Sequence, residues 1–548
     1  MLRIEQLHLK LNEPVSELPK KISKRLGIAE PESWRIVRES VDARDKSDIR
    51  FSYTVDFETA NEEKLLKRAV KRKNLNLKEA PKLSYSIPHS GYEKNKELPQ
   101  SLRPVIAGFG PCGMFAALML AEAGLCPIII ERGRKVEERA KDVDRFWKTG
   151  ELNPESNVQF GEGGAGTFSD GKLTTGIKDV RIAHVNEKLI EAGADEKISY
   201  SNMPHIGTDV LRKIVVNIRK KIISLGGEIR FESKLSNVEF SDGVLTAVTI
   251  NDDERIECAN LILSIGNSAA DTVEMLYKAG VKMEAKPFSV GARIEHPQLC
   301  IDEAQYGEHR NDSEGRLGAA AYKLSHHCAD GRGVYTFCMC PGGHVIAAAS
   351  ELEAVVTNGM SYHARNASNA NSALLVSINP EDYMPIETNN PIAGFEFQRN
   401  LERKAYELGG GGYKAPVQRV GDFMNGKPSI EESGHSVIPS YKPDVKWGSI
   451  EDCLPEFVIS AMREAIPQMA KKLRGFDLED AIFTAVETRS SSPVRILRER
   501  ESLEAVGLSG LYPGGEGAGY AGGIMSAAVD GIKMAEAVIK KIVSYDDK

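Results

Sequence analysis

The sequence lacks any apolar run of the roughly 18 residues that a membrane-spanning helix needs, so we expect no transmembrane segment. It also lacks an excess of basic residues. The net charge is −7 and the pI about 6.0, which excludes a global attraction to nucleic acid or to an anionic membrane. The opening MLRIEQLHLKLNEPV alternates apolar and polar residues and has no apolar block of the signal-peptide kind. We therefore expect a cytoplasmic protein without a membrane partner.

Cysteines are few and scattered, 8 in 548 residues, which predicts free thiols and no disulfide framework. One short region is richer in metal-ligand residue types, and it contains His326, His327, Cys328, Cys338 and Cys340. These residues do not follow the C-x₂-C or H-x₃₋₅-H spacing of zinc sites, so we predict no metal. The last two cysteines lie two apart on an expected strand. Their side chains should therefore face the same side, towards a core.

The first part of the chain, residues 1–90, is predicted to be a separate α+β domain. Its pattern reads strand, helix, strand, strand, helix, strand, with KLSYSI at 82–87 as the last strand. This βαββαβ order is typical of a ferredoxin-like fold. Its helices are basic. We interpret this as a solvated charged face in preference to a nucleic-acid or partner surface. The polar residues 89–104 are expected to form a linker.

The remaining length is too great for one hydrophobic core. We expect an α/β FAD-binding domain in two pieces, residues 101–285 and 496–548. Between them, residues 286–495 are expected to form a mostly β substrate domain with short helices. The predicted fold class is therefore α/β, a Rossmann-type domain with an inserted β domain and an N-terminal ferredoxin-like domain.

The segment VIAGFGPCGMFAALMLAEAGLCPIIIERG, residues 105–133, has the form strand, glycine turn, helix, strand. Its G-x-G-x-x-G glycines are Gly108, Gly110 and Gly113. They allow a tight turn, a close approach of the backbone to a pyrophosphate, and close packing of helix on strand. Glu131 ends the second strand, where it can accept hydrogen bonds from a ribose hydroxyl. A carboxylate there disfavours the 2′-phosphate of NADP and leaves FAD and NAD open.

A second glycine-rich segment, GLYPGGEGAGYAGGIMSAAVDG at 510–531, favours FAD. An NAD domain does not need a second loop and helix there, whereas a flavoprotein needs a helix start near the flavin ring. Reduced flavin carries negative charge near N1 and O2, which free backbone N–H groups stabilise. We expect Gly522, Gly523 and Ile524 to form that helix start. Gly515 and Glu516 should lie near the ribityl chain or the pyrophosphate.

The two glycine-rich segments resemble those of FAD-dependent oxidoreductases of the glutathione reductase structural class. GLYPGGEGAG with the following GG is similar to the flavin motif of fumarate reductase-like flavoproteins. Nearly the whole chain, including NPESNVQFGEGGAGTFSDGKL and VETRSSSPVRI, resembles a bacterial family of uncharacterised FAD-dependent dehydrogenases. The resemblance implies a resident, non-covalently bound FAD. It names no substrate.

In related flavoproteins a loop like FGEGGAGTFSDGKL, residues 160–173, passes beside the pyrophosphate and the flavin. A segment like ANLILSIG, residues 259–266, closes over the ADP moiety, and the backbone near Leu235 is expected to reach the adenine. The full set of residues expected to contact FAD is Gly108, Gly110, Pro111, Cys112, Gly113, Glu131, Arg132, Gly164, Thr167, Ser169, Lys172, Leu235, Ser264, Gly266, Gly515, Glu516, Gly522, Gly523 and Ile524.

For the chemistry we expect hydride transfer at flavin N5 to or from a small organic substrate. No C-x₄-C pair follows the first glycine motif, so a thiol relay is disfavoured. There is no second G-x-G-x-x-G unit. A nicotinamide or other electron donor would therefore bind without a dedicated Rossmann domain. The candidate catalytic residues are Arg293, Arg489 and His296, as electrophilic groups or as a general acid or base.

Reduction of a C=C bond beside a carboxylate or carbonyl is the first form of this hypothesis. A flavin-dependent monooxygenase is a second hypothesis, although its flavin motif usually carries Gly-Asp where this chain has Gly515 and Glu516. A third is a flavoprotein that docks on nucleic acid or a partner through its basic N-terminal domain, which the overall charge does not favour.

Overall fold

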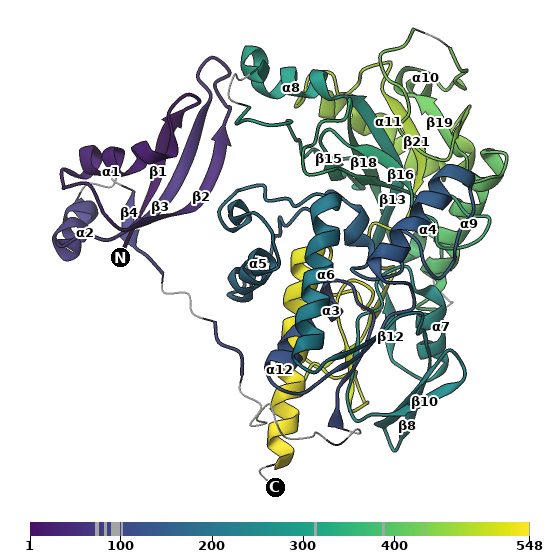
Figure 1. The fold of residues 1–548 in the computed structure, drawn as a ribbon. Helices are drawn as coiled ribbons and strands as arrows, with labels where there is room; N and C mark the ends of the chain where they lie inside the picture. The colour runs from purple at the N-terminus through teal and green to yellow at the C-terminus, as the bar shows by residue number, and fades with distance from the viewer. Residues whose placement is uncertain are drawn as a thin grey trace.

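Figure 1 shows a small N-terminal unit, in purple, to one side of a larger body. The computed structural model describes residues 1–71, 76–81, 85–88, 99, 102–311, 315–385, 390–432 and 434–546. Within these ranges, no helix has both the length and the apolar character needed to cross a membrane. The α/β body and the N-terminal α+β sheet confirm the predicted fold class.

The N-terminal unit is a four-stranded sheet of order β2-β3-β1-β4, antiparallel throughout, with two helices. This is the ferredoxin-like order. In β3 the side chains of Phe51, Tyr53, Val55 and Phe57 are buried at alternate positions, as the sequence predicts. The elements are β1 (Leu2–Lys10), α1 (Leu18–Leu26), β2 (Trp34–Asp42), β3 (Arg50–Phe57), α2 (Glu62–Lys71) and β4 (Leu77–Glu79).

The last strand of this unit was predicted in the wrong place. It is β4, where Leu77 pairs with Ile4 of β1. Of the predicted strand, residues 82–84 lie outside the described residues, and 85–88 form no strand. The apolar residues there serve the larger body instead, because Tyr85 and Ile87 pack against its core and the Tyr85 hydroxyl donates to Glu536 at 2.7 Å. Most of the expected linker also lies outside the described residues.

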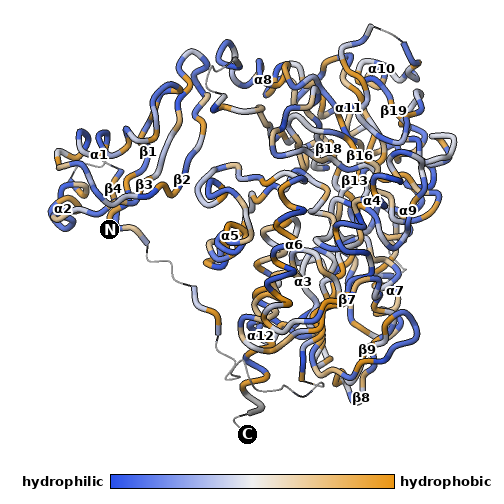
Figure 2. Tube along the Cα trace, viewed as in Figure 1, coloured by the Kyte–Doolittle hydropathy of each residue, from blue (hydrophilic) through white to orange (hydrophobic). Residues whose placement is uncertain are grey.

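A parallel five-stranded sheet of order β23-β11-β5-β6-β7 forms one part of the larger body. The sheet is built from two distant parts of the chain. Four of its strands come from residues 105–263, and β23, followed by α12, comes from residues 511–546. In Figure 2 much of α12 is orange, and it packs with the almost fully buried α3 in one core. The elements are β5 (Val105–Ala107), α3 (Pro111–Glu122), β6 (Ile128–Ile130), β7 (Glu228–Arg230), β11 (Leu261–Leu263), β23 (Leu511–Pro513) and α12 (Ile524–Asp546).

An antiparallel three-stranded sheet and several helices complete this part. They are α4 (Val136–Thr149), α5 (Arg181–Glu191), α6 (Thr208–Ser224), β8 (Leu235–Ser241), β9 (Val244–Ile250), β10 (Glu254–Glu257) and α7 (Ala270–Lys278). A two-stranded pair, β12 (Met283–Ala285) and β22 (Val494–Ile496), lies where the chain enters and leaves the next sheet.

The second large sheet has seven strands in the order β14-β15-β18-β13-β21-β19-β20. Its central strand β13 is buried along almost its whole length, including the charged side chains of Arg293 and Glu295. The strands are β13 (Phe288–Pro297), β14 (Ser325–His327), β15 (Gly333–Cys340), β18 (Asn369–Ile378), β19 (Ala415–Arg419), β20 (Val445–Trp447) and β21 (Ile482–Glu487). A separate hairpin pairs β16 (His344–Ala347) with β17 (Thr357–Met360).

The helices of this part are longer than the short ones expected. α9 has 16 residues and α11 has 15, and the core of the seven-stranded sheet includes apolar residues of both. The sheet needs these helices because its strands carry apolar side chains that would otherwise face water. The helices are α8 (Gln298–Tyr306), α9 (Ala393–Leu408), α10 (Val420–Met424) and α11 (Glu456–Ala470).

Candidate functional site: a cavity between the two large sheets

A cavity of about 450 Å³ is lined by residues of both large sheets. The parallel sheet contributes the residues at the carboxyl ends of β5, β6 and β11. The seven-stranded sheet contributes Thr336 to Met339 of β15 and Glu487 of β21. The carboxyl edge of a parallel sheet is where ligands bind in doubly wound α/β folds. The cavity therefore lies where doubly wound α/β folds bind their ligands.

The first glycine motif forms a crowded turn between β5 and α3. Gly108 has φ +97°, and an added Cβ would lie 2.4 Å from the carbonyl oxygen of Ser264. A Cβ on Gly113 would lie 1.9 Å from the carbonyl oxygen of Gly108. Gly110 is the N-cap of α3 and lines the cavity, and no side chain caps this helix end among the described residues. The backbone therefore approaches the cavity closely and offers N–H groups to an anion.

Glu131 lines the cavity at the end of β6, as the sequence predicts, but its carboxylate also holds the turn together. It accepts hydrogen bonds from the backbone N–H groups of Phe109 at 2.8 Å, Gly133 at 2.9 Å and Gly161 at 2.9 Å. These contacts tie the glycine turn to the loop at 160–173. The ribose contact remains a prediction.

The glycine-rich loop at 160–173 lies against the first glycine motif, with Gly164 facing Gly110. Lys172 lines the cavity with a buried ammonium group that has no hydrogen-bond partner among the described residues. Its nearest carboxylate oxygen, on Asp170, lies 3.8 Å away, and that carboxylate also receives Arg365 at 2.9 Å. Lys172 is therefore a cation incompletely satisfied by the chain itself, which favours an anionic group in the cavity.

The second glycine-rich segment reaches the cavity through Glu516, Gly522, Gly523 and Ile524, the last of which begins α12. Burial raises the pKa of Glu516 to about 7, although the Lys286 cation opposes the rise. The side-chain amide of Asn267 donates to its carboxylate at 3.0 Å. Glu516 can therefore hold or release a proton near neutral pH.

Most residues expected to contact the cofactor line this cavity, and three do not. Gly113 is packed against β5 and β11. Thr167 is buried and donates to the carbonyl oxygen of Glu162 at 3.3 Å. Gly515 donates its N–H to Asp530 at 2.8 Å. The expected residues that line the cavity are Gly108, Gly110, Pro111, Cys112, Glu131, Arg132, Gly164, Ser169, Lys172, Leu235, Ser264, Gly266, Glu516, Gly522, Gly523 and Ile524.

The candidate catalytic residues lie in three different places. Arg489 lines the cavity, but its guanidinium is paired with Glu402 at 2.7 Å and with Glu351 at 3.3 Å. Arg293 is fully buried behind the cavity wall. His296 does not line the cavity. Its Nε2 donates to the carbonyl oxygen of Phe476 at 2.9 Å, and burial lowers its pKa to about 4, so it is a neutral core residue. The structure therefore does not bring His296 to the expected site.

Arg293 acts on the cavity through Glu487, which lines it. The two side chains form a bidentate ion pair, with Nη2 donating to Oε1 at 3.0 Å. Arg293 also donates to Asn358 at 3.0 Å and to the carbonyl oxygen of Cys338 at 2.8 Å. Its guanidinium therefore contacts three cavity-lining residues, although Arg293 does not itself line the cavity.

Cys338 also lines the cavity, and the sequence pattern missed it. Simple alternation predicts that Cys338 and Cys340 share one core-facing side. A register shift in β15 between Phe337 and Cys340, with Cys338 at φ +43°, breaks that alternation. Cys340 stays fully buried while Cys338 reaches the cavity. A hydrogen bond from the Cys340 thiol lowers the pKa of Cys338, burial opposes it, and Lys172 and Arg293 lower it further.

Comparisons with known proteins identify the class. Residues 287–490 match the family described as "FAD-dependent protein, C-terminal domain-like", and residues 1–58 match a domain of unknown function, DUF8436. The chain is thus an FAD-dependent flavoprotein. Over 543 residues it is 49% identical to an "Uncharacterized protein" of Clostridium beijerinckii, covering 98% of this chain and 99% of that one. It belongs to the FAD-dependent family that this clostridial protein represents.

Several solved structures match this chain, all at low similarity. A mutant of the halogenase PltM in complex with FAD gives a TM-score of 0.39 at 11% identity, covering 81% of this chain and 70% of that chain. A flavoprotein/dehydrogenase from Cytophaga hutchinsonii gives 0.36 at 11%, covering 81% and 78%. Glycine oxidase from Bacillus cereus gives 0.31 at 12%, covering 80% and 95%. Similarity at this level identifies no reaction.

Proposed function

We propose that this protein is an FAD-dependent oxidoreductase that moves a hydride between the flavin and a small organic substrate in the cavity. The observation that carries the proposal is the composition of the cavity wall. Part of the wall is a glycine cradle at a helix N-terminus, and the wall also carries the ionisable groups Lys172, Glu487 and Glu516 together with the thiol Cys338. A module that only binds a dinucleotide would not need these ionisable groups and the thiol.

The residues fit FAD. The cradle around Gly108 and Gly110 leaves no room for a Cβ at Gly108 and exposes uncapped N–H groups of α3, which suits a pyrophosphate. Glu131 and Leu235 line the same cavity and would face the ribose and the adenine. Gly522 and Gly523 precede α12 and would face the flavin ring. When bound, FAD supplies a two-electron carrier that accepts or gives a hydride.

The chain supplies charge and protons around that carrier. The Lys172 ammonium would attract a carboxylate of the substrate or a developing negative charge, because no carboxylate of the described residues lies within hydrogen-bond distance of it. Glu516, with a pKa of about 7, would give or take the proton that accompanies hydride transfer. Arg293 would hold Glu487 in place. These roles suit reduction of a C=C bond beside a carboxylate or carbonyl.

Anaerobic half-reactions test the proposal. The purified flavoprotein would be reduced with NADH, NADPH or dithionite and then mixed with α,β-unsaturated acids, enones, quinones or oxygen. We expect an unsaturated acid or enone to reoxidise the flavin faster than oxygen does, with a reduced C=C bond in the product. Reoxidation by oxygen alone, with an oxygenated product, would instead support the monooxygenase hypothesis.

Lys172→Met tests the part of the proposal that concerns charge. Loss of a charge-assisted contact of about 1.5–3 kcal/mol predicts a KM for carboxylate acceptors raised about 10- to 150-fold, with a smaller effect on neutral quinones. Lys178→Met is the matched control, because Lys178 is exposed and does not line the cavity. Equal effects of the two variants on the carboxylate acceptors would contradict the assigned role.

A further inference from the structure

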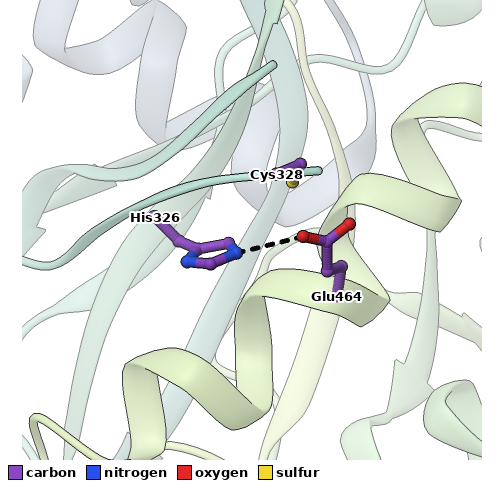
Figure 3. Close-up of side chains that lie close together, drawn as sticks. All are labelled: His326, Cys328 and Glu464. Atoms are coloured by element: carbon purple, nitrogen blue, oxygen red, sulfur yellow. Dashed lines mark hydrogen bonds and ion pairs between the residues drawn. The ribbon is translucent and has the colours of Figure 1, made fainter. Parts of the chain in front are cut away.

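A cluster of metal-ligand side chains lies in the seven-stranded part of the protein, outside the cavity. His326 is on the edge strand β14, Cys328 follows that strand, and Glu464 is on α11. Figure 3 shows the three side chains directed toward one another. One donor atom from each, an imidazole nitrogen, the thiol sulfur and a carboxylate oxygen, lie within 4.8 Å of one another.

The surrounding contacts already orient these groups. The ring nitrogen Nε2 of His326 lies 3.2 Å from Oε1 of Glu464, and the backbone N–H of Ala329 donates to the same oxygen at 2.9 Å. Among the described residues both contacts use Oε1, which leaves Oε2 available to a cation. The thiol of Cys328 is buried and donates to the carbonyl oxygen of Ala461, one turn before Glu464 on the same helix, at 3.7 Å.

We propose that His326, Cys328 and Glu464 bind a zinc ion that ties the edge strand β14 to helix α11. Thiolate, imidazole and carboxylate are the protein ligands of Zn²⁺. With bonds of about 2.0–2.3 Å, a tetrahedral ion needs its ligand atoms roughly 3.3–3.7 Å apart. The 3.2 Å between Nε2 of His326 and Oε1 of Glu464 is just below that range, and all three donor groups lie within 4.8 Å, so small side-chain rotations bring one nitrogen, one sulfur and one carboxylate oxygen into place. Water occupies the fourth position, since Glu464 is partly exposed.

The site is structural and not part of the redox chemistry, because none of its three residues lines the cavity. Within the part of the chain that the structure describes, β14 is a three-residue strand that pairs only with β15. A metal bridge to α11 would stabilise this weakly held edge. Binding requires loss of the Cys328 proton.

Metal analysis and competition with a chromophoric chelator test the proposal on the full-length flavoprotein. We expect one equivalent of zinc to bind saturably and to raise the melting temperature. Each of Cys328→Ser and Glu464→Gln should weaken binding more than about 100-fold, the upper range for loss of a residue that only supports a ligand. His327→Gln is the matched control, because this exposed neighbour points to the other side of the strand and should leave binding unchanged.

Cobalt substitution gives an independent readout, because the spectrum of the wild type alone reports whether a thiolate binds the metal. Thiolate ligation predicts a sulfur-to-cobalt charge-transfer absorption in the wild type that is absent in Cys328→Ser and retained in His327→Gln. Absence of saturable zinc binding by the wild type, or a cobalt spectrum without the sulfur band, would overturn the proposal.

Discussion

Gly108→Ala is the substitution that tests most sharply how the glycine turn is built. Gly108 has φ +97°, a conformation that L-residues with a side chain rarely adopt. Its Cβ would lie 2.4 Å from the carbonyl oxygen of Ser264, and ordinary contacts begin near 3.4 Å. The turn and β11 must therefore separate by about an ångström. Since Ser264 also lines the cavity, the displacement falls directly on the predicted cofactor site.

Two costs add in this variant. The unfavourable φ costs about 1–2 kcal/mol, and the steric overlap costs a further 1–3 kcal/mol or so. Gly280→Ala isolates the first cost, because Gly280 has φ +84° but nothing within 4 Å of the added Cβ and does not line the cavity. The difference between the two variants is thus the steric term alone. If the turn moves to relieve the overlap, FAD affinity falls by about 5- to 150-fold.

The assay compares urea unfolding of the two apoproteins and FAD binding by fluorescence quenching. We expect Gly108→Ala to be less stable than Gly280→Ala and to bind FAD more weakly, while Gly280→Ala keeps wild-type affinity. Equal stability and equal FAD affinity in the two variants would refute the reasoning about the packed turn.

Two further predictions concern buried charge. Glu516 has its pKa raised from 4.5 to about 7 in the folded state, so its contribution to stability falls as pH rises from about 4.5 to 7. Glu516→Gln should therefore gain stability relative to the wild type across that window, as measured by urea unfolding; a difference independent of pH would contradict the shift. Arg293→Met leaves Glu487 buried without its partner and should cost about 3–5 kcal/mol, and the double variant with Glu487→Gln should recover much of it. Strictly additive costs in a double-mutant cycle would contradict the buried pair.

Local sequence signals predicted correctly where the two glycine-rich segments lead from a strand into a helix. The turn at Gly108, Gly110 and Gly113 depends on residues that are close in sequence, and β5, α3 and β6 form where the pattern places them. The second glycine-rich segment begins α12 beside the same cavity. The turn is predictable because Gly108 and Gly113 meet local steric needs that a residue with a Cβ does not satisfy.

The other half of the site depends on tertiary contacts that no local pattern contains. The shift in β15 that turns Cys338 into the cavity is invisible to an alternating pattern. His296 lies on β13 and ends in the core, where its ring contacts the carbonyl oxygen of Phe476 from a distant segment. Glu464 joins His326 and Cys328 only through the packing of α11, so a search by ligand spacing could not find the cluster.

The amount and identity of the flavin in the purified protein test the central claim most directly. Protein isolated without added cofactor, or reconstituted with FAD and passed through a desalting column, should show an oxidised flavin spectrum. Denaturation should release FAD in equimolar amount to the chain, confirmed by chromatography. A colourless wild-type protein that takes up no FAD, with a Gly108→Ala variant that shows the same lack of FAD binding, would contradict the account.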